Sequence, residues 1–473
     1  MRYTDENNRE ITRPAGIESG QSGLRQARLA LSALTVFRPV LQDELLAGLD
    51  ALLAHLDSDK PDIIGAVDMY GSLCSGLLTR GTGLKAYMIE KVLYTENTFS
   101  IEAEKRGMDC LDGCIGEAVK RDLEHLCIIA SLMPGTIKKW IADRCCASGW
   151  QEKTVSGLPE WPEYGDPDAA RPANACMLTD TRIYNRFLNS ASWHKYTDEL
   201  AEFHKRWGSG IFSKYRAFVW KKKGRDGYFQ PVEFPDPVRF SDLISYETER
   251  EDIIENTLRF LDGYPANNIL LYGDRGTGKS STVKALVNEY YGRGLRMIEV
   301  PKKLLPDYQA IVSRLAGRNL KFILFVDDLS IEENEENYTA LKAALEGGLE
   351  NRPSNVLIYA TSNRKHLIRE RFSERAGLMS GNADDEVRAA DTIQEKLSLS
   401  DRFGMTLVFS SPDKKRYLEI VEGIARNRGL EVDRDFMHRE ALKWELRFNG
   451  RSPRTAKQFV DWLEGTVLSG RQA

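Results

Sequence analysis

The segment from Gly273 to Ser280 constrains the fold of this chain more than any other part of its sequence. It reads Gly-Asp-Arg-Gly-Thr-Gly-Lys-Ser and fits the pattern GxxxxGK[ST], with a short apolar run before it and an amphipathic stretch after it. Glycines let such a loop curl its backbone N–H groups around phosphate oxygens, and the N-terminus of the following helix adds partial positive charge. The pattern therefore predicts a strand, a phosphate-binding loop and a helix in succession.

The side chains of this loop predict how a bound phosphate chain is held. We expect Lys279 to reach the β and γ phosphates and the Ser280 hydroxyl to bind Mg²⁺. A chance glycine-rich turn is disfavoured because the strand, loop and helix signals agree. The residues expected to line the phosphates are Gly273, Asp274, Arg275, Gly276, Thr277, Gly278, Lys279, Ser280 and Ser281.

A second copy of four letters of this loop, Arg80-Gly81-Thr82-Gly83, lacks its chemistry. Leu84 stands at the position of the lysine, and no apolar strand leads into the segment. We interpret this copy as a turn that connects two helices.

Two carboxylates follow the apolar run at 322–326, namely Asp327 and Asp328. Ligands of an open parallel sheet bind at the carboxyl ends of its strands, so both acids are expected at the phosphate site. Asp327 suits the magnesium shell, where it would hold a coordinated water, and Asp328 is placed to polarise the attacking water as general base. The alternative is a strand that simply ends in two acidic residues without a function. The phosphate-loop motif in the same chain disfavours this alternative.

A polar tip also follows the next apolar run, 356–360, in the form of Thr361, Ser362 and Asn363. The Asn363 amide is placed to hydrogen-bond the attacking water or the γ-phosphate. Taken alone, an asparagine at such a position is typical of a turn.

Five short apolar runs after Phe240 alternate with amphipathic stretches, which predicts an α/β fold with a five-stranded parallel sheet. The region before it has helical spacing, as in Leu45, Leu49, Leu52 and Leu56. The basic run from Lys221 to Arg225 reads as a solvated turn. We expect a flexible N-terminus at 1–24, a helical domain at 25–150, a linker and approach segment at 151–239, a nucleotide-binding core at 240–411 and a small helical tail at 412–473.

Composition excludes several classes of protein. The chain has 473 residues, 42% hydrophobic and 29% charged, which describes a globular chain of more than one domain. No apolar stretch is long enough to span a membrane, and the polar start of the chain does not resemble a secretory signal, so we expect a cytoplasmic protein. The net charge of −4 gives no general attraction to nucleic acid. Seven cysteines without a CxxC pair favour buried thiols over disulfides or zinc.

The order of these motifs resembles the AAA+ ATPases from Phe240 to about Leu468, roughly half of the chain. The resemblance implies ATP and Mg²⁺ as cofactors, Lys279 and Ser280 in Walker A, Asp327 and Asp328 in Walker B, and Asn363 as sensor 1. It also implies that the helical tail is a lid and that the protein assembles into a ring or a transient oligomer, a hexamer among the options.

Three further positions are assigned by the resemblance alone. The segment from Ser398 to Gly404 looks like the arginine-finger segment, which implies that Arg402 reaches the γ-phosphate of a neighbouring subunit. Arg454 stands where sensor 2 would contact the phosphates of its own subunit. Tyr246 lies in the segment that the family places near the adenine.

More narrowly, 264–410 is similar to a bacterial AAA+ family of ATP-binding proteins of unknown function.

Two departures from the AAA+ pattern bear on activity. The usual Walker B ends in Asp-Glu, whereas Asp328 is one methylene shorter, so we expect slow hydrolysis, below the common enzyme median of about 10 per second. The loop from Pro301 to Pro306 lacks the aromatic residue beside a glycine that protein-threading machines carry, which disfavours threading.

The leading hypothesis is an ATP-dependent switch or remodelling factor that acts on an unidentified protein client through its N-terminal region. A DNA-associated motor or loader is the alternative, suggested by the similarity of the tail to DNA-acting AAA+ proteins and by Lys302 and Lys303. A catalytic N-terminal region is a third reading, but its scattered histidines form no recognised constellation. A kinase is disfavoured because nothing marks an acceptor site.

Overall fold

The computed structural model describes residues 20–162, 181–329, 341–342, 345, 353–363, 402–448 and 450–468. The chain divides into two compact units, Met1–Tyr215 and Arg216–Ala473. The predicted flexible segment 1–24 falls mostly outside the described residues, and the first helix begins at Gln21.

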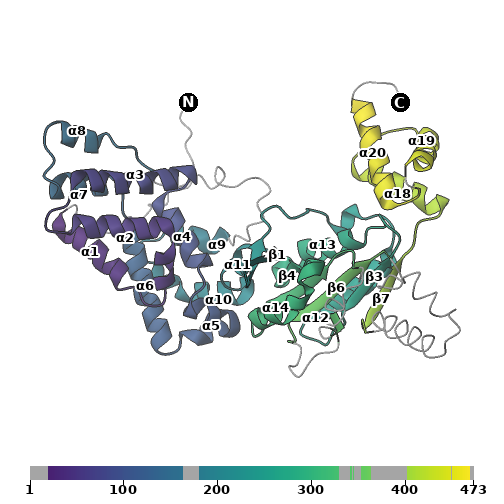
Figure 1. The fold of residues 1–473 in the computed structure, drawn as a ribbon, viewed down its shortest axis with the longest axis horizontal. Helices are drawn as coiled ribbons and strands as arrows, with labels where there is room; N and C mark the ends of the chain where they lie inside the picture. The colour runs from purple at the N-terminus through teal and green to yellow at the C-terminus, as the bar shows by residue number, and fades with distance from the viewer. Residues whose placement is uncertain are drawn as a thin grey trace, which may run out of the picture. The chain divides into compact units, whose positions relative to one another are not determined.

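The N-terminal unit is helical throughout its described residues (Figure 1). The predicted turn at Arg80–Gly83 is confirmed, since it joins two helices, α3 and α4. The elements of the unit are α1 (Gln21–Ser32), η1 (Arg38–Gln42), α2 (Glu44–Leu56), α3 (Ile63–Thr79), α4 (Leu84–Tyr94), α5 (Thr98–Arg106), η2 (Gly107–Leu111), α6 (Cys114–Ala130), α7 (Pro134–Arg144), α8 (Trp150–Ser156), α9 (Thr181–Leu188), η3 (Trp193–Tyr196), α10 (Thr197–Trp207) and α11 (Ile211–Lys214).

One hydrophobic core holds this unit together, and it extends further along the chain than the predicted boundary at residue 150. Phe187, Trp193 and Leu200 are fully buried in the same core as Leu24. The segment 151–239 is therefore not a continuous linker: its first part completes the helical unit, and its last part begins the second unit. The proline-rich composition of 151–175 hides the helical pattern on either side of it.

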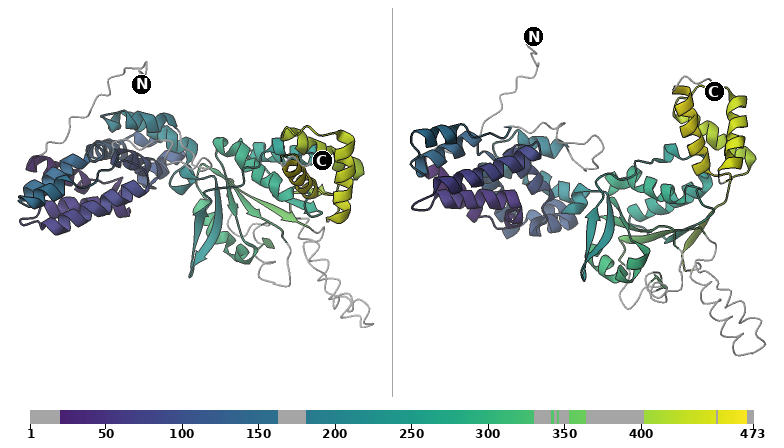
Figure 2. Two further views of the ribbon diagram at one scale, coloured as in Figure 1. Left: turned by 90° about the horizontal axis from the view of Figure 1, so that it is seen from above. Right: turned by 45° about the horizontal axis from the view of Figure 1, so that its top comes forward.

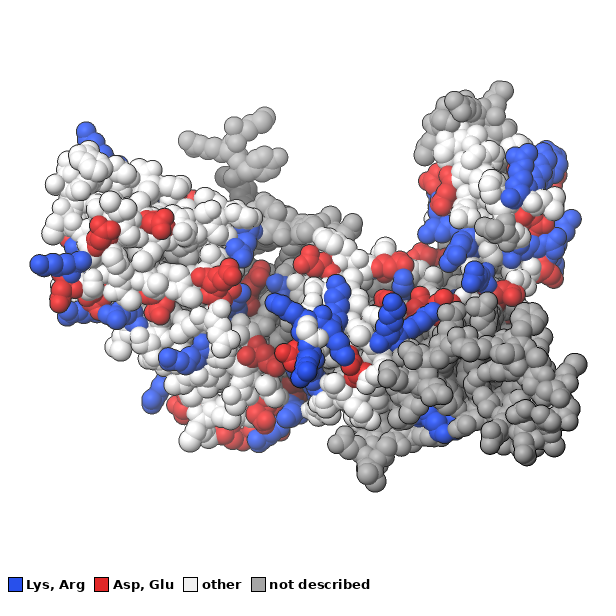
Figure 3. Space-filling view, viewed as in Figure 1, with Lys and Arg blue, Asp and Glu red and all other residues white. Residues whose placement is uncertain are grey.

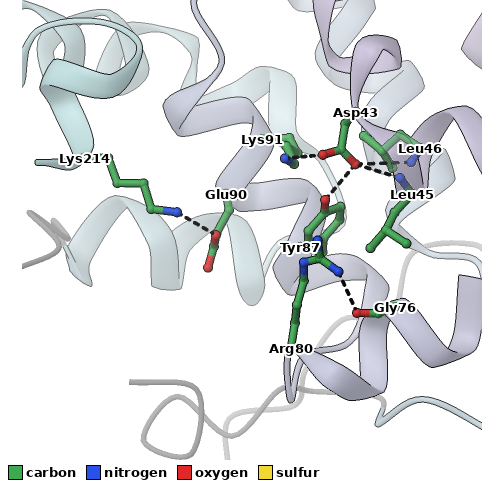
Figure 4. A network of polar contacts seen from close by, with 9 residues as sticks. All are labelled: Asp43, Leu45, Leu46, Gly76, Arg80, Tyr87, Glu90, Lys91 and Lys214. Atoms are coloured by element: carbon green, nitrogen blue, oxygen red, sulfur yellow. Dashed lines mark hydrogen bonds and ion pairs between the residues drawn. The ribbon is translucent and has the colours of Figure 1, made fainter. Parts of the chain in front are cut away.

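Partly buried polar groups connect the helices of this unit to one another (Figure 4). Asp43 accepts hydrogen bonds from the backbone N–H groups at the start of α2, and so acts as its N-cap. The same carboxylate accepts from the Tyr87 hydroxyl at 2.7 Å and from the Lys91 ammonium at 2.5 Å, both on α4. One acid thus caps α2 and attaches α4 to it.

The C-terminal unit contains a seven-stranded sheet with the order β2-β1-β4-β5-β6-β3-β7. The five predicted strands are present and parallel, but the predicted count of five is wrong, because β1 and β2 extend the sheet beyond β4. The strands are β1 (Ala217–Lys223), β2 (Asp226–Pro231), β3 (Ile269–Gly273), β4 (Leu295–Glu299), β5 (Lys321–Val326), β6 (Val356–Ser362) and β7 (Met405–Phe409).

The two additional strands form a hairpin. The predicted turn at 221–225 is correct only for Gly224 and Arg225, because Lys221, Lys222 and Lys223 belong to β1. β1 pairs in parallel with β4 over 217–219 and antiparallel with β2 over 218–223. Trp220 is buried at 1% exposure, packs on Phe229 and donates a hydrogen bond from Nε1 to Asp307 at 3.0 Å. A Cβ at Gly227 would lie 1.9 Å from the Trp220 ring, so glycine is required there.

Helices cover both faces of this sheet, as the views in Figure 2 show. On one face, α12 (Glu247–Leu261) and α13 (Lys279–Tyr290) pack on alternate residues of the strands, such as Ile269, Ile323 and Tyr359. On the other face, η6 (Lys302–Asp307) and α14 (Tyr308–Leu315) pack on Leu324 and Ile358. Short 3-10 turns, η4 (Phe240–Asp242) and η5 (Tyr291–Arg293), lead into and out of these helices.

The helical tail consists of α18 (Lys414–Asn427), α19 (Arg434–Arg447) and α20 (Pro453–Leu468), which share one core around Tyr417 and Phe459. Asp413 and Asp433 cap the first two helices through their carboxylates. The tail is as helical as the sequence predicts.

The cysteines are free thiols wherever the structure describes them. Cys74, Cys110 and Cys127 are buried as expected, whereas Cys114 and Cys146 are exposed because they lie at the start of α6 and just after α7. Within the described ranges, no helix combines the length and the apolar character needed to cross a lipid bilayer.

Candidate nucleotide-binding site

The loop from Gly273 to Gly278 joins the carboxyl end of β3 to the N-terminus of α13, as the sequence predicts. Gly273, Gly276 and Gly278 all have positive φ, which residues with a side chain rarely adopt. A Cβ at Gly273 would lie 2.1 Å from the carbonyl oxygen of Phe409 on β7. The glycines are therefore needed both for the curl of the loop and for its close approach to the sheet.

Lys279 is the first residue of α13, and its side chain reaches back into this loop. Its ammonium donates hydrogen bonds to the carbonyl oxygens of Gly273 at 2.9 Å and Asp274 at 2.6 Å, and to Oδ1 of Asn363 at 3.2 Å. Burial lowers the pKa of Lys279, although the neighbouring acids Asp274, Asp327 and Asp328 oppose that shift. The lysine is thus held between the phosphate loop and the tip of β6, where the predicted sensor stands.

Ser280 and Asp327 meet at the predicted metal position. The Ser280 hydroxyl donates to Oδ1 of Asp327 at 2.5 Å, and the same oxygen accepts from the Thr361 hydroxyl at 2.6 Å. A hydroxyl and a carboxylate are ligands that suit Mg²⁺, which keeps several waters and takes only one or two carboxylates from a protein. The residues present therefore fit a magnesium site. Within the described ranges, no group of three or more His, Cys, Asp or Glu is placed to hold a metal ion by itself.

Asp328 follows on a left-handed backbone, with φ of 52°. Its carboxylate accepts hydrogen bonds from the Asn363 amide at 2.5 Å and from Lys302 at 3.4 Å. Its backbone N–H donates to the Thr361 hydroxyl at 2.8 Å. The predicted base and the predicted sensor are therefore in direct contact, and Lys302 forms an ion pair with the base.

A cleft of about 1120 Å³ opens over these groups and extends to the helical tail. Lys279, Asp327 and Asn363 line its polar side, and Ile244, Ile420 and Ile424 line an apolar side. Ser281, Arg275 and Arg454 also line it, and their contacts with a nucleotide stay predictions. Arg454 is exposed, and its backbone N–H donates to the carbonyl oxygen of Gly276 at 3.1 Å, so the start of α20 contacts the phosphate loop directly.

Tyr246 also lines this cleft, but most of its side chain is used in packing. Its ring stacks on the ring of Phe409, with centroids 5.2 Å apart. The guanidinium of Arg416, a residue of α18, lies 4.2 Å from the centroid of the Tyr246 ring. Its hydroxyl donates to the carbonyl oxygen of Ser410 at 2.6 Å, and burial raises the pKa of Tyr246 to about 12. Tyr246 therefore lies where β7 leads into the helical tail.

Arg402 does not line the cleft in the described part of the chain. It is half-buried in the turn that precedes β7, and most of the predicted finger segment before it, 398–401, falls outside the described residues. Its predicted role toward a neighbouring subunit stays a prediction.

Sequence reasoning missed three residues that the structure places at the site. Thr361 joins the two acids, Lys302 pairs with the base, and Ser411 donates its backbone N–H to the Asp274 carboxylate at 2.8 Å. A hydrogen bond with the Ser411 side chain, together with this backbone hydrogen bond, lowers the pKa of Asp274. The contact partners lie far apart in the sequence, so no local motif marks them.

Parts of this chain match a protein family and two curated relatives. Residues 213–467, more than half of the chain, match the model of a family described as "Protein of unknown function (DUF815)". The chain is 24% identical over 241 residues to the "Putative 26S proteasome regulatory subunit homolog MJ1494" of Methanocaldococcus jannaschii. It is 24% identical over 191 residues to "Replication factor C subunit 3" of Saccharomyces cerevisiae. These matches cover 44% and 37% of this chain and span 63% and 54% of the two relatives.

Solved structures of Thermotoga maritima RuvB are similar as well. A mutant of that protein gives a TM-score of 0.35 at 16% identity, over 50% of this chain and 67% of that chain. The structure titled as its Holliday junction branch migration motor gives 0.30 at 14% identity, over 48% and 72%.

Proposed function

This chain belongs to the DUF815 family, its P-loop module is of the AAA+ type, and on that premise we propose that it binds Mg·ATP and hydrolyses it as a conformational switch or remodelling factor for a protein client. The observation that carries the proposal is the convergence of Lys279, the Ser280–Asp327 pair and the Asp328–Asn363 pair in one cleft. Together they supply a cation that binds the phosphates, a position for the metal ion and a general base.

Different residues of the site have different roles in binding and hydrolysis. Loop N–H groups and Lys279 hold the triphosphate, and Ser280 and Asp327 hold Mg²⁺, which neutralises phosphate charge when bound. Asp328 accepts the proton of the attacking water, and Asn363 orients Asp328 and that water. Lys302 forms an ion pair with the Asp328 carboxylate, and the short side chain of Asp328 leads us to expect slow turnover.

Calorimetry with Mg·ATP tests the binding step. We expect Lys279→Ala to weaken binding by at least about tenfold, because a charge-assisted hydrogen bond contributes about 1.5–3 kcal/mol. The exposed Lys303→Ala variant is the matched control and should bind like wild type. Equal affinities of the Lys279→Ala variant and wild type would refute the phosphate site.

Steady-state phosphate release tests the base. We expect Asp328→Asn to lower kcat by about 10²–10⁴ while Mg·ATP still binds, since that range is typical of a general base. An unaffected rate would remove Asp328 from this role.

Assembly is part of the same proposal. Arg402 of one subunit completes the site of its neighbour, and such a finger contributes about a thousandfold or more in rate. Arg402→Ala should therefore hydrolyse ATP slowly at every protein concentration, whereas the wild-type rate should rise as light scattering reports association. A variant as active as wild type would rule out a shared site.

A nucleic-acid role is the second candidate, favoured by the name of the yeast relative. The contact between Lys302 and Asp328 weakens it, because that lysine serves the ATP site. Figure 3 shows Lys and Arg interspersed with Asp and Glu over the N-terminal unit, without one basic face in that view. ATPase activity stimulated by DNA, with affinity that falls steeply with salt, would support this candidate.

A further inference from the structure

Asp274 is the second residue of the phosphate loop, and its carboxylate needs an explanation. A carboxylate beside a triphosphate is repelled by it, so phosphate binding alone gives no reason for an acid at this position. The structure shows what the carboxylate does instead: it accepts a hydrogen bond from the backbone N–H of Ser411 at 2.8 Å. Asp274 thus connects the phosphate loop to a segment about 140 positions further along the chain.

The backbone of Asp274 is equally engaged. Its N–H donates to the carbonyl oxygen of Phe409 at 3.1 Å, and its own carbonyl oxygen accepts from Lys279 at 2.6 Å and from the Thr277 hydroxyl at 2.9 Å. One residue therefore contacts the phosphate-binding lysine on one side and the end of β7 on the other.

Ser411 lies in the short connection between β7 and α18, the first helix of the tail. Tyr246 holds the preceding residue through its hydrogen bond to the Ser410 carbonyl, and its ring lies against Phe409 and Arg416. The connection is thus fixed at two adjacent residues, once by Tyr246 and once by the phosphate loop. Any change in the Asp274 carboxylate acts on the point where the tail begins.

We propose that Asp274 is a positioning residue that couples the phosphate loop to the helical tail through the hydrogen bond between its carboxylate and Ser411. The inference rests on the proposed function, because a bound triphosphate is what perturbs Asp274. The phosphates draw the Lys279 ammonium away from the Asp274 carbonyl and repel the Asp274 carboxylate. Both effects alter the bond to Ser411, and the connection to α18 responds.

Hydrogen–deuterium exchange on the full-length chain, with and without Mg·AMP-PNP, tests this coupling. In wild type, nucleotide should change exchange both in the phosphate loop and in a peptide covering 410–417. In the Asp274→Ala variant, exchange of 410–417 without nucleotide should rise about tenfold or more, as expected when one hydrogen bond to a charged group is lost. Nucleotide should still protect the loop of this variant but no longer change 410–417.

Two further variants separate charge from hydrogen bonding. Asp274→Asn keeps an acceptor without the charge, so it should restore the low exchange of 410–417 but not its full response to nucleotide. Ser411→Pro removes the donor and should reproduce the Asp274→Ala result, with no added effect in the double variant. Asp252→Asn, an exposed acid on α12, is the matched control and should behave as wild type.

The outcomes distinguish this inference from the proposed function. If the Asp274→Ala variant keeps the nucleotide response of 410–417, Asp274 does not couple the two regions. The same conclusion follows if nucleotide protects the wild-type loop without any change in 410–417. If nucleotide does not protect the wild-type loop at all, the proposed function fails, and the coupling fails with it.

Discussion

At the scale of single residues, one threonine hydroxyl aligns the two acids of the site. Thr361 donates to Asp327 and accepts from the backbone N–H of Asp328, and it is buried at 1% exposure. Because Asp327 and Asp328 have different predicted roles, a single hydroxyl fixes the metal position relative to the base. Thr361 is therefore a positioning residue for both.

Replacing Thr361 by valine should lower kcat about tenfold or more, because it removes the hydrogen bond that the hydroxyl donates to Asp327 and the one that it accepts from the backbone N–H of Asp328, at a cost of about 1–3 kcal/mol. Thr361→Ser keeps the hydroxyl and is the matched control, which should retain most of the activity. Phosphate release at saturating and limiting Mg·ATP gives kcat and KM separately. A valine variant that turns over like the serine variant would show that the hydroxyl does not position the acids.

His204 makes the stability of the N-terminal unit depend on pH. It is fully buried, donates from Nδ1 to the Gly208 carbonyl at 3.1 Å and packs edge-on against Phe99. Burial lowers the pKa of His204 to about 4. The unfolded chain, with a histidine pKa near 6.5, therefore binds more protons than the folded chain between these values.

The contribution of His204 to stability is complete above about pH 6.5 and is lost as pH falls toward about 4, by at most about 1.4 kcal/mol per pH unit. Urea unfolding of the full-length chain between pH 4.5 and 7 measures this slope. In His204→Leu the slope over that interval should be smaller than in wild type. Equal slopes would contradict the assignment.

Residues that form a local motif could be predicted from the sequence, and residues that act through distant contacts could not. Lys279, Ser280 and Asp327 stand in recognisable spacings, and the structure brings them together. Ser411 and Lys302 have no such spacing, since they reach the site only because the ends of β7 and β4 lie beside it.

At the scale of elements, burial decides which strands can be predicted. β5 and β6 are buried on both faces, so they read as continuous apolar runs. β1 ends in three exposed lysines, and β2 is mostly exposed or half-buried, so the hairpin lacks that signal. The partners that secure it, Asp307 and Arg314, come from η6 and α14.

The hairpin should depend on the absence of a side chain at Gly227. We expect Gly227→Ala to destabilise the C-terminal unit by about 1–3 kcal/mol, because the new methyl group overlaps the Trp220 ring and forces it to move. Gly292→Ala is the matched control, since no atom lies within 4 Å of the position that a Cβ would take there. Thermal unfolding of both variants measures the difference, and equal midpoints would contradict the packing described above.

At the scale of the whole molecule, the described residues fall into two units that meet in sequence at Tyr215 and Arg216. Composition places the start of the nucleotide-binding core at 240 instead, because the proline-containing segment before Phe240 resembles a linker. In the structure this segment includes β1 and β2, and β1 pairs with β4 inside the sheet. A truncation experiment distinguishes the two boundaries.

A chain that begins at Arg216 should fold and bind Mg·ATP with the affinity of the full-length protein. A chain that begins at Phe240 should be poorly soluble, because it exposes the edge of β4 and the surface that Trp220 covers. Calorimetry and gel filtration of the two truncated chains give the comparison. If the shorter chain is equally soluble and binds equally well, β1 and β2 are dispensable for the nucleotide-binding fold.

The left-handed backbone at Asp328 explains why an acid with a short side chain occupies this position. Aspartate tolerates positive φ better than glutamate, because its carboxylate can bond to the nearby main chain. Asp328→Glu would therefore not simply restore a longer reach: it would also strain the turn and displace the carboxylate from Asn363. The expected slow hydrolysis and the backbone conformation at Asp328 are therefore linked, and a faster variant would need a redesigned turn together with a longer acidic side chain.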